Sequence, residues 1–102
     1  MRKDEFKVWL LTKIHAKPTS DCISRCRTVE TALNVDLDVE YLRDRCETVL
    51  NKMQYGIKDE KENKEAPTGF HFKEDANIRY RLTDLRSAVR KYVKFCNENM
   101  GK

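Results

Sequence analysis

The chain has 102 residues, of which 39% are hydrophobic and 37% charged. This length suits one hydrophobic core, because domains usually contain roughly 50–200 residues, and we expect a single helical domain over residues 1–102. Regular apolar stripes argue against a disordered chain. No apolar run approaches the roughly 18 residues of a membrane-spanning helix, and VWLLTKI is too short for a signal peptide. We therefore expect a cytoplasmic protein without membrane contact.

The net charge of +4 is unevenly distributed. Residues 1–20 and 78–102 are basic, whereas residues 21–77 carry more acidic than basic side chains. A localised patch of one sign can steer a partner of opposite charge even when the total is small. The basic ends therefore indicate an acidic partner.

The four cysteines, Cys22, Cys26, Cys46 and Cys96, are expected to be reduced thiols. Zinc sites usually combine two closely spaced ligand pairs, and only Cys22 and Cys26 form such a pair here. We expect no metal and no other cofactor. No nucleophile with its base, carboxylate pair or glycine-rich phosphate loop stands out, so we do not expect an enzyme.

Three helices are predicted before the middle of the chain. The first runs from Asp4 to Ala16 and ends because Pro18 disfavours a helical Lys17. The second covers residues 20–33 after the possible caps Thr19, Ser20 and Asp21. The third begins at Asp36 or Asp38, and Gly56 is its left-handed stop. Its inward side chains are Leu42, Cys46, Val49, Leu50 and Met53.

Residues 57–77 lack a helical period, and we expect a mobile polar loop over residues 58–69. Phe70 and Phe72 are expected to return the chain to the core. The last helix then runs from near Asp75 to Asn99. The predicted fold is therefore an all-α bundle of four helices, with a long polar loop between helices three and four.

The last helix has an apolar stripe and a basic ridge. Spacings of three and four residues place one set of apolar side chains on a narrow arc: Ile78, Leu82, Leu85, Val89, Tyr92 and Cys96. A second arc, a quarter turn away, holds Arg79, Arg86, Arg90 and Lys94. Only Asp84 and Glu98 offer acidic partners within this helix, so the ridge is expected to face another helix or a phosphate backbone. The alternative is an ordinary solvated helix flank.

The segments resemble, in their order, the SAM-like core-binding domain on the N-terminal side of tyrosine recombinases and phage integrases. They also resemble the helical domain that precedes the catalytic part of some restriction-type endonucleases. The resemblance rests on FKVWLLTKI, PTSDCISRCRTVETAL, DVEYLRDRCETVL and NIRYRLTDLRSAVRKYVKFC. In the last segment the matching positions are Arg79 or Arg81, Leu82, Leu85, Arg86, Tyr92 and Phe95.

This resemblance implies a non-catalytic module of SAM-like arrangement that clasps double-stranded DNA, largely through its backbone. Carried onto this chain, and with Lys94 of the ridge, the contacts are Ser20, Arg25, Arg27, Arg79, Arg86, Arg90 and Lys94. A catalytic domain or another protein would be a further partner. The alternative is a helical module for protein interaction or dimerisation.

Overall fold

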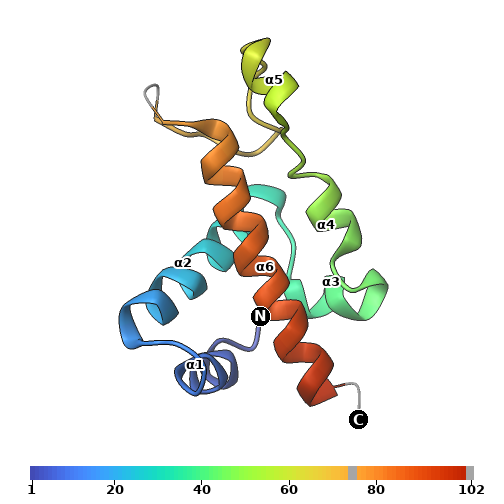
Figure 1. Cartoon of the computed structure of the whole chain (residues 1–102). Coiled ribbons are helices and arrows are strands. Elements are labelled where there is room, and N and C mark those ends of the chain that lie inside the picture. Colours follow the sequence, from blue (N-terminus) through green and yellow to red (C-terminus); the bar gives the residue numbers. More distant parts are fainter. Residues whose placement is uncertain (74–75, 101–102) are drawn as a thin grey trace.

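The computed structural model describes residues 1–73 and 76–100, with Met100 described by its backbone alone. These residues form six helices and no strand (Figure 1). The helices are α1 (Lys3–Leu11), α2 (Ala16–Leu33), α3 (Leu37–Asp44), α4 (Glu47–Asn51), α5 (Ile57–Lys61) and α6 (Ile78–Met100). The prediction of an all-α fold is confirmed. The third predicted helix is divided into α3 and α4, and the expected polar loop contains α5.

The junction between α1 and α2 lies earlier than predicted. α1 ends where the Thr12 hydroxyl donates a hydrogen bond to the carbonyl of Trp9 at 2.6 Å. His15 has an extended backbone and is the N-cap residue of α2. Pro18 therefore lies in the first turn of α2, where its missing N–H costs no helical hydrogen bond. The prediction that Pro18 ends a helix was wrong, and the expected caps at 19–21 lie inside α2.

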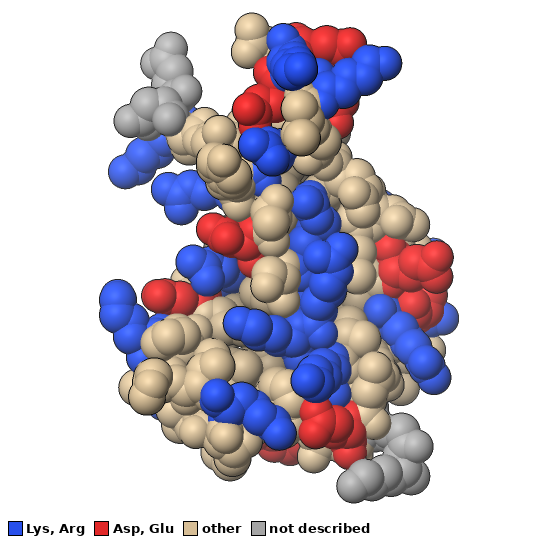
Figure 2. Space-filling view, viewed as in Figure 1, with Lys and Arg blue, Asp and Glu red and all other residues tan. Residues whose placement is uncertain are grey.

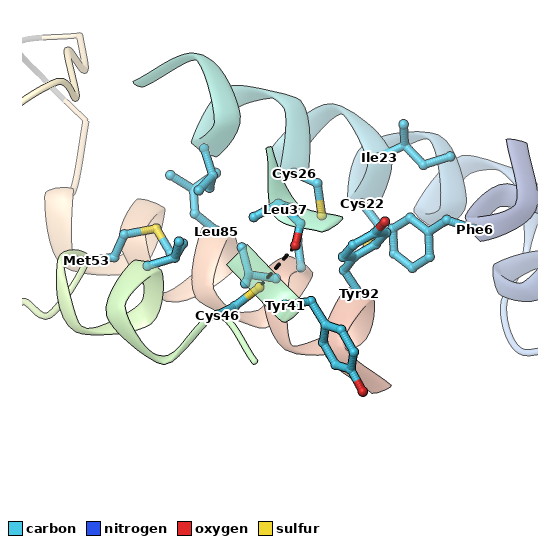
Figure 3. Close-up of a cluster of buried hydrophobic side chains, with 14 of the residues drawn as sticks. Phe6, Cys22, Ile23, Cys26, Leu37, Tyr41, Cys46, Met53, Leu85 and Tyr92 are labelled. Atoms are coloured by element: carbon cyan, nitrogen blue, oxygen red, sulfur yellow. Dashed lines mark hydrogen bonds between the residues drawn. The ribbon is translucent and has the colours of Figure 1, made fainter. Parts of the chain in front are cut away.

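Two consecutive left-handed residues separate α3 from α4. Arg45 has φ 56° and Cys46 has φ 64°, a conformation that stops a helix. Cys46 is buried, and its thiol donates to the carbonyl of Leu37 at 3.6 Å (Figure 3). Leu42, which was expected in the core, is 70% exposed because the buried face of α3 is formed by Leu37, Glu40 and Tyr41.

Gly56 begins a helix and does not stop one. Its φ is −99°, and its N–H donates to the carboxylate of Asp59 at 2.8 Å at the start of α5. After α5 the chain is tied back by the Tyr55 hydroxyl, which donates to the carbonyl of Lys64 at 2.5 Å. Part of the expected loop over 58–69 is therefore helical. Its mobility stays a prediction.

α6 is the central helix of the fold (Figure 1). It contacts α1, α2, α3 and α5. Its apolar stripe faces the core as predicted, with Ile78 half-buried and the remaining members buried. The expected start at Asp75 lies outside the described residues.

Aromatic side chains join α1 to the second half of α6. The rings of Phe6 and Tyr92 meet edge to face with centroids 4.9 Å apart, and Phe6 lies 5.4 Å from Phe95 (Figure 3). The Tyr92 hydroxyl accepts the backbone N–H of Arg2 at 2.9 Å and donates to the carboxylate of Asp38. A buried tyrosine therefore has both an apolar contact and satisfied polar groups.

Candidate nucleic-acid interface

Arg79, the first residue of the predicted ridge, has an acidic partner on α5. Its Nε donates to Glu60 Oε2 at 2.6 Å, and its guanidinium lies 4.8 Å from the centre of the Tyr80 ring. The hydrogen bond to Glu60 raises the pKa of Arg79. Arg79 therefore faces another helix, which is one of the two alternatives expected for the ridge.

Arg86 is a structural residue. It is half-buried, its Nη1 donates to the carbonyl of Met53 after α4, and its Nη2 donates to the Thr83 hydroxyl at 3.2 Å. Burial, followed by the nearby charge of Arg90, lowers the pKa of Arg86. Arg86 thus joins α6 to the end of α4, which the sequence pattern did not indicate.

The rest of the ridge is exposed and gains one more member. Arg90, Lys91 and Lys94 are exposed on consecutive turns of α6, and we call these three residues the basic band. Within residues 1–73 and 76–99, no carboxylate forms a salt bridge with any of them. Figure 2 shows Lys and Arg side chains following α6 down the face turned to the viewer.

The predicted residues of α2 point to different sides of that helix. Arg25 and Arg27 are two positions apart, which corresponds to about 200° around a helix. Arg25 lines a pocket of about 400 Å³ between α2 and α6, which we call the seam pocket, together with Arg81. Arg27 lines a pocket of about 550 Å³ on the outer side of α2, the outer pocket, together with Lys3 and Ser20.

Arg25 lies at the contact of α2 with α6. A hydrogen bond with Cys26, followed by the charges of Lys91 and Arg25, lowers the pKa of Cys22. Arg25 also lines the seam pocket together with Asp84 and Leu85 of α6. This places Arg25 at the edge of the α6 surface.

Ser20 does not lie at a helix N-terminus. It is exposed in the second turn of α2, so free N–H groups at 19–21 are not available for a phosphate in the way that the expected cap implied. Its hydroxyl lines the outer pocket.

Residues 69–72, which we call the strap, separate the outer pocket from the seam pocket. Gly69 has φ +96°, and a Cβ at this position would lie 2.1 Å from the carbonyl oxygen of Ala32 in α2. Phe70 is buried and Phe72 half-buried, as expected, with their rings stacked at 6.1 Å. His71 is exposed and lines both pockets.

The four cysteines are free and buried in the core. Burial raises the pKa of Cys46 to about 12, so its thiol is protonated at neutral pH. In the described part of the chain, no group of three or more His, Cys, Asp or Glu side chains could hold a metal ion.

Three basic residues of these surfaces were missed by the sequence pattern: Lys3, Arg81 and Lys91. Arg81 and Lys91 fall outside the narrow arc chosen for the ridge, although both are exposed. Lys3 reaches the outer pocket only through the packing of α1 against α2. A helical wheel of α6 that counted every charged residue would have found Arg81 and Lys91.

Comparisons with protein-family models, with curated proteins and with solved structures gave no match. Among the helices of the described residues, none is both long and apolar enough to cross a bilayer.

Proposed function

We propose that this chain is a non-catalytic module that binds double-stranded DNA through the basic band, together with Arg25. The observation that carries the proposal is the exposed band itself. Three like charges on one helix repel each other, and because they form no salt bridge in the described residues they gain no ion-pair stabilisation. A row of phosphates would neutralise them and release counterions.

This proposal keeps the earlier resemblance but changes the contacts. We propose a SAM-like arrangement related to the core-binding domains, in a cytoplasmic protein. Arg90 and Lys94 remain contacts, whereas Arg79 and Arg86 serve mainly to hold α5 and α4 against α6. Of the predicted residues of α2, Arg25 remains a contact of the duplex, whereas Ser20 and Arg27 line the outer pocket and are not duplex contacts.

The test is fluorescence anisotropy of labelled duplex DNA at several salt concentrations. Three to five phosphate contacts predict a slope of log affinity against log salt of about −3 to −4.5. The triple variant R90A/K91A/K94A should lose most binding. The charge-matched variant K52A/K58A/K61A removes three exposed lysines elsewhere, and it should bind as the unaltered protein does. Equal losses in the two variants would show that only total charge matters.

The second candidate function is protein interaction, and exposed apolar side chains on α3 favour it. Val39 and Leu42 are 59% and 70% exposed, one helical turn apart. A protein interface built on them would depend little on salt. Sedimentation at low and high salt, with L42E for comparison, would distinguish it from DNA binding.

A further inference from the structure

The outer pocket and the seam pocket lie on the two sides of the strap, and they share four lining residues: Ser24, Thr28, His71 and Phe72. We call the two pockets together the α2 groove. Their volumes, about 550 and 400 Å³, are in the usual range for small ligands, which is roughly 300–1,000 Å³. Each pocket can therefore take a nucleotide-sized group, and neither can take a duplex.

The α2 groove is lined by four cations. It is lined by Lys3 and Arg27 on the outer side and by Arg25 and Arg81 on the seam side. In the described parts of the chain, none of these four forms a salt bridge. They place cations at both ends of the groove, and the outer side, which no carboxylate of the described residues lines, is the side that suits a phosphate.

The strap supplies aromatic surface between these cations. Phe72 is stacked on buried Phe70 at 6.1 Å, with an interplanar angle of 19°, and the same side chain lines both pockets. His71 is exposed beside it. Grooves that hold single strands combine positive charge with aromatic side chains on which unpaired bases stack.

Two carboxylates also line the seam pocket. Asp21 and Asp84 face the same space as Arg25 and Arg81 without forming salt bridges with them. Carboxylates repel phosphates but accept hydrogen bonds from the amino groups of bases. The mixed lining of this pocket therefore suits a base with an exocyclic amino group better than a free phosphate.

From these observations we infer that the α2 groove binds an unpaired strand of nucleic acid beside the duplex held by the basic band. The preferred ligand is then a duplex with a single-stranded tail. The duplex part of this inference rests on the proposed function, whereas the binding of a single strand in the groove does not. The seam side of the groove lies where α2 packs against α6, the helix that carries the band.

The test compares three labelled DNA ligands: a blunt duplex, the same duplex with a cytosine-rich tail, and the tail alone. A tail of about six nucleotides falls within the site size of roughly 4–16 nucleotides found for single-strand grooves. The groove variant is R27A/H71A, which changes two exposed side chains and is checked for folding by circular dichroism. The band variant is R90A/K91A/K94A, and K52A/K58A/K61A is the control.

We expect the tail to strengthen binding about tenfold or more, whichever end of the duplex carries it. This is the effect expected from stacking roughly one base on an aromatic side chain. The groove variant should lose this gain and keep its affinity for the blunt duplex. The band variant should weaken the blunt and the tailed duplex alike.

The outcomes separate the two proposals. A tail without effect on the unaltered protein, or a gain that survives R27A/H71A, would overturn the groove inference and leave duplex binding intact. Binding of the tail alone through the groove, with no binding of the blunt duplex, would overturn the proposed function and leave the groove. If no DNA binds at low salt, both proposals fail.

Discussion

Glu60 and Arg79 form a hydrogen-bonded ion pair, with Glu60 Oε2 2.6 Å from Arg79 Nε. The pair joins α5 to the first turn of α6. Because Arg79 is paired with Glu60, it is not available to bind a phosphate together with the basic band.

The ion pair predicts an effect of E60Q on DNA binding. Neutralising Glu60 frees Arg79, so duplex affinity should rise by roughly two- to fivefold, while stability should fall only slightly because both groups are partly exposed. Anisotropy and urea denaturation measure the two effects. E62Q, a neighbouring acid that pairs with Lys64, is the control. An equal gain in E62Q would point to net charge as the cause.

Arg86 and Arg90 should differ in their effects on stability. R86A removes donors from the Met53 carbonyl and from Thr83, and should lower the free energy of unfolding by about 1–2 kcal/mol. R90A removes an exposed side chain and should change it by less than about 0.5 kcal/mol. Urea denaturation of the two variants provides the comparison. A similar cost for both would contradict a structural role for Arg86.

Gly69 predicts a strong requirement for glycine in the strap. G69A places a Cβ 2.1 Å from the Ala32 carbonyl oxygen and must also adopt a positive φ, so it should destabilise the protein by about 1–3 kcal/mol. G56A is the matched control, because φ there is −99° and the nearest atom to the added Cβ is 3.9 Å away. Thermal unfolding of both variants tests the difference. A G69A protein as stable as G56A would show that the strap moves freely on α2.

The amine of Met1 predicts a loss of stability at alkaline pH. It donates to Asp36 at 2.7 Å and to Glu30 at 3.1 Å. Burial alone would lower its pKa, but the two carboxylates raise it above the ordinary 8.0. The stabilisation is therefore complete below pH 8.0 and is lost as pH rises through the higher pKa of the folded state.

At acid pH the sign is reversed. The hydrogen bond from the Met1 amine lowers the pKa of Asp36 below 3.8, so its contribution is present above that value and disappears as pH falls through the lower pKa of the folded state. Urea denaturation across pH measures both limbs. Adding a residue before Met1 displaces the amine, so the stability of this variant should fall less as the pH rises above 8.0. Identical pH profiles would contradict a role for the ion pairs.

The sequence was a good guide to the helices that bury a stripe. α2 and α6 are long and amphipathic, and their buried residues recur at the expected three and four positions. The predicted helix boundaries were wrong where one residue type is common both at the end of a helix and at the start of the next. Pro18 can follow one helix or open the next, and Gly56 can stop one or cap another. The break at Arg45 and Cys46 had no glycine to mark it.

The candidate surface was predicted in part, for a similar reason. Helical periodicity identified Arg90 and Lys94 as exposed, because exposure on a long helix follows from the stripe opposite. It could not indicate that Glu60 and Met53, distant in sequence, would contact Arg79 and Arg86. The α2 groove was not predicted at all, since it depends on a strap whose position is set by Gly69 and Phe70.

The central position of α6 also has a consequence for how the chain folds. α1 and α2 pack on a helix that is more than 40 residues further along the sequence, and Arg2 is hydrogen-bonded to Tyr92. Such non-local contacts slow folding, because the chain loses the entropy of loop closure before the core contacts stabilise it. During synthesis, residues 1–77 would therefore expose the apolar faces of α1 and α2 until α6 emerges. A chaperone that shields those faces would act on this protein in that interval.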